Sequence, residues 1–98
     1  MTVRVSPRTA MAPAAVRVAV AIEADDDNRM LRVVAESDDF YRASEVQIDG
    51  GTGPRVRWID FRHLPSGTYE VSATLTGIRG RRAMTTHVVE ILPSASGR

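Results

Sequence analysis

The sequence contains neither cysteine nor lysine, and both absences narrow what the chain can do. Without cysteine it forms no disulfides, no thiolate metal sites and no cysteine nucleophile. All thirteen basic residues are arginine. A GC-rich coding bias is the simplest explanation, although arginine also gives bidentate, stackable contacts to a partner. The formal net charge of +1 argues against a strongly electrostatic partner such as duplex nucleic acid.

Long apolar segments and helical periodicity are also missing. The longest stretch of low polarity, residues 10–21, is interrupted by Pro13 and Arg17, and it is shorter than the roughly 18–20 residues that a membrane-spanning helix needs. We therefore expect no membrane span. Arg4 and Arg8 are not followed by a clear apolar region and cleavage site, so no signal peptide is expected. No compartment is predicted.

What recurs along the chain is the alternation of apolar and polar residues, which is the pattern of half-buried β-strands. It predicts six strands, with a seventh as a short edge strand around Val3 and Val5. The six strands cover residues 16–22, 31–36, 40–48, 55–62, 69–75 and 83–92.

Turn signals separate these segments. The acidic cluster at 25–28 is expected at the tip of a hairpin, with the second acidic turn at 37–39 at the opposite end of the following strand. Poor alternation at 43–45 indicates a bulge or loop. Val56 and Trp58 stand in one phase and the next apolar residues in the other, which indicates either a bulge near Trp58 or partial cover on both faces.

The most informative segment runs from Leu64 through Pro65 and Gly67 to Tyr69. Proline fixes φ and glycine tolerates positive φ, so this segment predicts a tight corner. A tyrosine just after such a corner, on the inward face of a strand, is what a tyrosine corner requires. Its ring fills the edge of the core while its hydroxyl bonds the backbone.

Several short strands without helices between them favour antiparallel sheets over a parallel one. We therefore predict an all-β fold, an immunoglobulin-like antiparallel β-sandwich of six or seven strands. Residues 1–13 are expected to form an N-terminal arm with a possible edge strand, residues 14–92 the sandwich domain, and residues 93–98 a flexible tail.

The corner at Leu64–Tyr69, the alternation that follows it, the glycine-containing hairpin and the valine-rich last strand resemble known modules. They look like the C-terminal half of immunoglobulin-like or fibronectin type III-like bacterial modules, and are also similar to transthyretin-like regulatory domains beside carboxypeptidases. The resemblance covers roughly residues 56–92 and lacks the Cys…Trp…Cys pattern of antibody domains. It implies an accessory module that serves as a spacer, an adhesive unit or a partner-binding domain.

Arginines gather in two places. One group lies in the strand around Trp58, the single tryptophan, and the other surrounds the last hairpin. They are a candidate surface for a protein partner or a neighbouring domain, and carbohydrate binding through Trp58 and nearby polar loops is the alternative. A simpler interpretation is a solvated strand face on which arginine stems cover apolar surface. In that interpretation Phe40, Tyr41 and Trp58 belong to the core or its edge. The candidate partner-binding residues are Arg55, Arg57, Trp58, Arg62, Arg79, Arg81 and Arg82.

No catalytic, metal or cofactor site is predicted. The carboxylates at 25–28 are an alternative Ca²⁺ site, but a solvated turn is favoured because the EF-hand spacing is absent. His63 and His87 are the only histidines, too few for a converging metal site. Ser44, His63 and Asp60 can be combined as a triad on paper, yet no nucleophile elbow is present. We therefore expect a protein that is not an enzyme.

Open strand edges offer a second route to partners. Residues 85–89 carry β-branched side chains on both faces and few charges, and Val88 faces away from Val89. Ala19 and Ala21 leave the outer face of the first strand small and apolar. Both features are compatible with a homodimer through edge strands or with a neighbouring domain.

Overall fold

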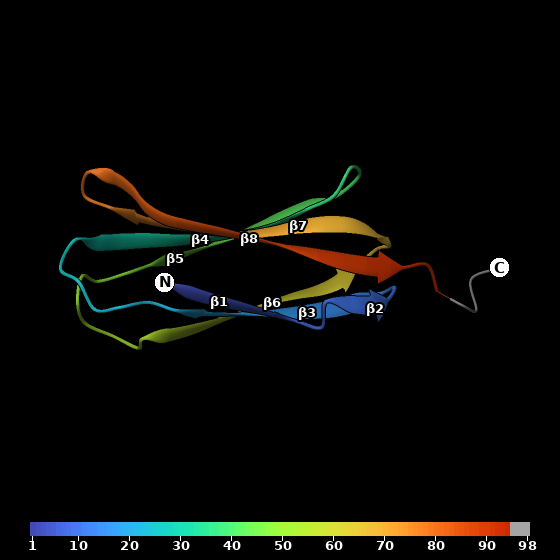
Figure 1. The fold of residues 1–98 in the computed structure, drawn as a ribbon, viewed down its shortest axis with the longest axis horizontal. Coiled ribbons are helices and arrows are strands. Elements are labelled where there is room, and N and C mark those ends of the chain that lie inside the picture. Colours follow the sequence, from blue (N-terminus) through green and yellow to red (C-terminus); the bar gives the residue numbers. More distant parts are fainter. Residues whose placement is uncertain (95–98) are drawn as a thin grey trace.

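The computed structural model describes residues 1–94, and within them the chain is all β. Two separate sheets contain the strands (Figure 1), one of three strands in the order β1-β3-β6 and one of five in the order β2-β8-β7-β4-β5. The strands are β1 (Thr2–Ser6), β2 (Thr9–Met11), β3 (Ala14–Ala21), β4 (Asn28–Glu36), β5 (Tyr41–Gln47), β6 (Val56–Leu64), β7 (Gly67–Gly77) and β8 (Gly80–Leu92). Residues 1–94 include no helix that could cross a membrane.

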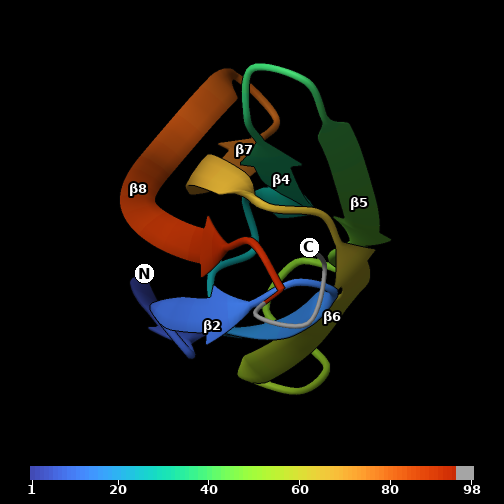
Figure 2. The same ribbon diagram turned by 90° about the vertical axis from the view of Figure 1, so that its right-hand side faces the viewer.

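The inward side chains of both sheets meet in one hydrophobic core. The predicted alternation of β3, β4, β7 and β8 is confirmed, because the side chains expected to face inward are buried. The five-stranded sheet curls from β8 round to β5 and faces the three-stranded sheet across this core (Figure 2). The largest fully buried apolar side chains are Tyr69, Phe61, Leu31, Leu64 and Ile91.

The predicted tyrosine corner is present where β6 turns into β7. Tyr69 is fully buried, and its hydroxyl donates a hydrogen bond of 2.7 Å to the carbonyl oxygen of Pro65. The Phe40 ring packs edge-on against it, with centroids 6.1 Å apart. Through its contact with Phe40, Tyr69 therefore joins the corner to the residue that precedes β5.

The expected hairpin between β3 and β4 is wrong. β3 pairs with β1 and β6, whereas β4 pairs with β5 and β7, so the acidic segment 25–27 is a connection from one sheet to the other. Alternation within a strand sets which face is buried, but it does not choose the neighbouring strand. The second acidic turn, at 37–39, does lie at the opposite end of β4, as expected.

Residues 1–13 contribute a strand to each sheet. The predicted edge strand at Val3 and Val5 is confirmed as β1, which pairs antiparallel with β3 and buries both valines. β2 was not predicted, because three residues are too few to show alternation. It pairs parallel with the end of β8, and cis peptide bonds precede Pro7 and Pro13 on either side of it.

The bulge or loop expected at 43–45 is absent, and so is the bulge near Trp58, which was one of two alternatives for that strand. β5 pairs with β4 without a break from Tyr41 to Gln47, so no bulge interrupts 43–45. β6 is in regular register around Trp58, and the shift in its pairing with β3 lies between Ala14 and Val16. Within β6, His63 adopts a left-handed backbone conformation, with φ at 59°.

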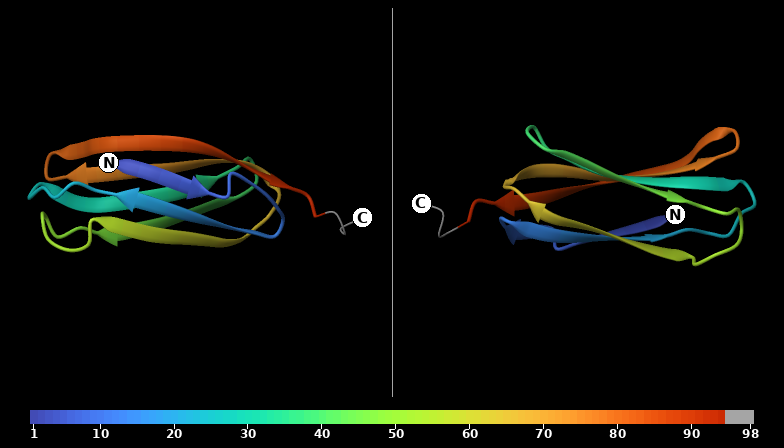
Figure 3. Two further views of the ribbon diagram at one scale, coloured as in Figure 1. Left: turned by 60° about the horizontal axis from the view of Figure 1, so that its bottom comes forward. Right: turned by 180° about the vertical axis from the view of Figure 1, so that it is seen from behind.

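The strands run along the length of the molecule (Figure 3), which measures 52 × 22 × 16 Å along its principal axes. β8, with 13 residues, is the longest of the described strands and ends close to the corner, beside β2. Most of the tail predicted at 93–98 lies outside the described residues.

Candidate functional site

The outer face of the three-stranded sheet carries the only tryptophan of the chain. Along β6, Ile59 and Phe61 point into the core, while Val56 and Trp58 point out. Trp58 is 63% exposed, so the expectation that it belongs to the core or its edge is wrong. The same expectation fails for Tyr41, which is 54% exposed, and holds for Phe40, which is half-buried against the core.

The register of the three strands builds a shallow hollow next to this tryptophan. Arg4, Ala19 and Trp58 form one row across β1, β3 and β6. The next row consists of Thr2, Ala21 and Val56. β3, the middle strand, contributes only the methyl groups of two alanines to these rows. The surface is therefore lower there than at the larger side chains of β1 and β6. The hollow measures about 270 Å³, and its walls are almost wholly apolar.

A salt bridge borders the hollow on one side. The guanidinium of Arg17 binds both carboxylate oxygens of Asp60, at 2.8 and 3.1 Å. It also lies over the Trp58 ring, 5.4 Å from the centroid. The hydrogen bond from Arg17 lowers the pKa of Asp60. The Arg17 guanidinium therefore covers one part of the indole. We call this surface the Trp58 surface; it comprises Thr2, Arg4, Arg17, Ala19, Ala21, Val56, Trp58 and Asp60.

The predicted arginines do not form one continuous strip. Arg55 and Arg57 lie where β6 begins, and Arg57 has the inward phase and is only half exposed. Arg62 lies near the other end of β6, on the outer face. The second group, Arg79, Arg81 and Arg82, lies on the hairpin that joins β7 and β8 in the other sheet. The two groups therefore belong to different surfaces.

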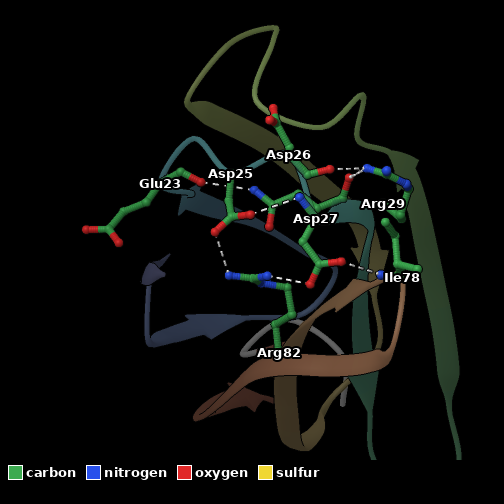
Figure 4. Close-up of polar contacts among 8 residues, drawn as sticks. Glu23, Asp25, Asp26, Asp27, Arg29, Ile78 and Arg82 are labelled. Carbon is green, nitrogen blue, oxygen red and sulfur yellow. Dashed lines mark hydrogen bonds and ion pairs between the residues drawn. The ribbon is translucent and has the colours of Figure 1, made fainter.

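Arg82 is part of a polar clamp that ties the sheet-to-sheet connection to this hairpin (Figure 4). Its guanidinium bridges Asp25 at 2.9 Å and Asp27 at 2.5 Å. The other oxygen of Asp27 accepts the backbone N–H of Ile78 at 2.9 Å. These hydrogen bonds, first that from Ile78 and then that from Arg82, lower the pKa of Asp27. We call Asp25, Asp27, Ile78 and Arg82 the Asp27 clamp.

The Asp27 clamp uses carboxylates that were considered as an alternative Ca²⁺ site. Two of the clustered carboxylates bind a guanidinium rather than standing open to a cation, while Asp26 turns its backbone carbonyl towards Arg29 at 2.5 Å. Across residues 1–94, no three histidine, cysteine or acidic side chains are grouped in a way that would hold a metal ion. The acidic segment connects β3 of one sheet to β4 of the other, and two of its carboxylates are bound by Arg82.

The structure brings together neither the two histidines nor the residues considered as a catalytic triad, Ser44, His63 and Asp60. His63 is exposed at the end of β6, whereas His87 is half-buried on β8, with Nδ1 at 3.2 Å from Arg8. Asp60 is engaged by Arg17. Ser44 lies on β5, a strand of the other sheet.

Sequence reasoning missed Arg4 and Arg17 because they become part of the surface only through strand pairing. The small outer face at Ala19 and Ala21 was visible in the alternation of β3. What was not visible was that β6 would place Trp58 directly beside Ala19.

Comparisons of the chain with protein-family models, with curated proteins and with solved structures find no match. The function is therefore argued from the surfaces described above.

Proposed function

We propose that the chain is an immunoglobulin-like β-sandwich that serves as a non-enzymatic protein-interaction module and binds its partner through the Trp58 surface. The strand order supports this fold. An immunoglobulin sandwich places its second and fifth strands side by side in one sheet and its third, sixth and seventh in the other. The pairs β3–β6 and β4–β7–β8 follow this arrangement, with β5 added next to β4. The tyrosine corner before the penultimate strand is a further feature of this class.

The observation that carries the function is the exposed Trp58 next to an apolar hollow. Exposed tryptophan is among the residues that contribute most to protein interfaces. Ala19 and Ala21 leave room for one apolar side chain of a partner, and burial of apolar surface drives association. Of the two cations at the border, Arg17 is paired with Asp60 and Arg4 is exposed. The surface therefore keeps a net positive charge, and a partner with an acidic residue beside its apolar anchor fits it in charge.

The partner class we favour is therefore a protein segment with an apolar side chain flanked by carboxylates. Duplex nucleic acid is disfavoured, because the cations on this surface are few and one of them is already paired with Asp60. Such a segment can belong to a separate protein, to a second copy of this chain or to an adjacent domain.

Carbohydrate binding is the second candidate, and the accessible indole is the observation in its favour. Sugars stack on an aromatic ring, but their hydroxyl groups also need hydrogen-bonding partners. The hollow is lined almost entirely by apolar atoms. We therefore rank a protein partner above a glycan.

A selection experiment tests the proposal directly. A phage-displayed peptide library is selected against the parent protein, with counter-selection against Ala21→Gln, which fills the hollow. The matched control is Ala43→Gln, which places the same side chain on the exposed outer face of β5.

We expect the enriched peptides to combine an apolar residue with acidic neighbours, to bind the Ala43→Gln protein as they bind the parent, and to bind Ala21→Gln at least tenfold more weakly, about 1.4 kcal/mol. Peptides that do not distinguish the two variants would refute the proposal. A glycan array that binds the parent but not Trp58→Ala would instead favour the carbohydrate candidate.

A further inference from the structure

One long strand edge of the five-stranded sheet has no hydrogen-bonded partner strand over most of its length. β8 pairs with β7 from Gly80 to Ile91, but β2 covers its other side only from Glu90 to Leu92. Figure 2 shows β8 at the border of this sheet, with β2 beside its end. Within residues 1–94, the stretch 80–88 is thus paired on one side only.

The hydrogen bonds to the segment around β2 define which backbone groups face this open side. The N–H of Glu90 donates to Arg8 at 2.8 Å, and the carbonyl of Leu92 accepts from Ala12 at 2.8 Å. Even-numbered residues at this end of β8 therefore direct their backbone groups away from β7. Because direction alternates along a strand, the N–H and C=O groups of Met84, Thr86 and Val88 also point to the open side.

The side chains of this stretch of β8 carry none of the features that discourage pairing, and the charged group next to it is the Arg8 guanidinium, 3.2 Å from Nδ1 of His87. Residues 83–89 include no Asp, Glu, Lys, Arg, Pro or Gly. Met84 and Val88 are 52% and 58% exposed on the outer face, with Thr86 between them. An uncharged, β-branched edge with unpaired backbone groups is what a further strand adds to.

The edge strands of the two sheets carry the features that proteins use to block edge pairing. β5 has Arg42 and Glu45, and the Arg42 guanidinium donates to the backbone oxygen of Arg62 on β6 at 2.7 Å. β6 also carries Asp60, and β1 carries Arg4. β2, which forms the border beyond β8, is only three residues long. The middle of β8 is the exception.

We propose that a second copy of this chain occupies this edge, with β8 of one copy antiparallel to β8 of the other. The two open stretches are identical in length and composition, so a twofold axis satisfies both at once. The antiparallel orientation brings Arg81 of each copy towards the end of β8 that carries Glu90 in the other, whereas a parallel one would align like charges. The two five-stranded sheets become one continuous sheet. This interface is separate from the Trp58 surface.

The test compares Thr86→Pro with Thr86→Val. The N–H of Thr86 faces the open side, so proline removes no hydrogen bond within the chain, whereas valine keeps the N–H and the β-branched shape. Sedimentation across a wide concentration series is expected to show a monomer–dimer equilibrium for the parent and for Thr86→Val. Thr86→Pro should weaken the dimer by about thirtyfold or more, because one hydrogen bond is lost in each copy.

Amide hydrogen exchange gives a readout that does not depend on a variant. The amides of Met84, Thr86 and Val88 should exchange more slowly as the protein concentration rises. Those of Thr85 and His87, which face β7, should be protected at every concentration. A protein that stays monomeric throughout the series, or a dimer that persists unchanged in Thr86→Pro, would overturn the proposal, whatever the Trp58 surface binds.

Discussion

Tyr69 shows at the scale of a single residue how the corner is held. Its ring lies in the core between the two sheets, and its hydroxyl spans the corner to the carbonyl of Pro65. A buried hydroxyl without a partner would be costly, so the hydrogen bond is part of why a tyrosine rather than a leucine fits here.

Removal of this hydroxyl is expected to cost stability without changing the fold. Tyr69→Phe should lower the free energy of unfolding by about 0.5–1.5 kcal/mol through the lost hydrogen bond. Tyr69→Ala should lower it by about 3–5 kcal/mol through the cavity. Urea unfolding followed by circular dichroism measures both, with Tyr41→Phe on the exposed tyrosine as control. A Tyr69→Ala protein as stable as the parent would contradict this role.

Asp27 is the residue whose titration should be visible in the stability of the fold. Its pKa is lowered in the folded state from the ordinary 3.8, first by the Ile78 N–H and then by Arg82. A carboxyl with a lowered pKa stabilises the fold above its unfolded-state pKa, and this contribution is lost as the pH falls through the folded-state value. The parent should therefore become easier to unfold with urea as the pH drops through and below 3.8.

Asp27→Asn should flatten this part of the pH profile, whereas Asp39→Asn in the exposed turn before β5 should keep the profile of the parent. The measurement is the urea midpoint at a series of acidic pH values. If Asp27→Asn retains the full acid loss, the clamp does not contribute to it.

The connection between β3 and β4 depends on an element that tolerates only glycine at one position. A Cβ added to Gly77 would lie 2.6 Å from Oδ2 of Asp27 and 2.8 Å from its backbone oxygen. The end of β7 therefore packs against the Asp27 clamp with no room for a side chain.

Gly77→Ala should destabilise the protein by about 1–3 kcal/mol, because overpacking displaces the clamp. In an Asp27→Ala background the same substitution should cost less, since the nearest atom has been removed. Thermal unfolding of the four proteins of this double-mutant cycle gives the coupling. Additive effects of the two substitutions would contradict the contact.

β6 has two faces whose roles can be separated by one pair of substitutions. Phe61 points into the core and Trp58 into solvent. Phe61→Ala should cost about 3–5 kcal/mol, whereas Trp58→Ala should change the free energy of unfolding by no more than about 0.5 kcal/mol. Urea unfolding decides the matter, and the opposite ranking would mean that the strand faces the other way.

Apart from the three-residue strand β2, the strands could be predicted from sequence, but their pairing partners could not. Alternation at Val16–Val20, Leu31–Ala35 and Tyr69–Leu75 correctly gave the inward faces, because burial of one face has a period of two. Pairing of β3 with β6, across the intervening β4 and β5, depends on contacts distant in sequence, so the nearest turn signal misled. The Trp58 surface was missed for the same reason, since strand pairing alone sets Ala19 beside Trp58.

At the scale of the whole molecule, two surfaces lie on separate sheets. The Trp58 surface belongs to the three-stranded sheet, and the open edge of β8 belongs to the five-stranded one. A module with both can associate with a second copy and still present its tryptophan to a partner. The Asp27 clamp and the Tyr69 corner each lie where the chain passes between the sheets, so they keep the two surfaces in a fixed relation.

The most direct test of the account is the fluorescence of Trp58 in the free protein, because it is the only tryptophan. We predict red-shifted, solvent-like emission that iodide quenches readily, and a blue shift with loss of quenching when a peptide from the selection binds. A blue-shifted emission that iodide does not quench in the free protein would contradict the account, since the indole would then be buried.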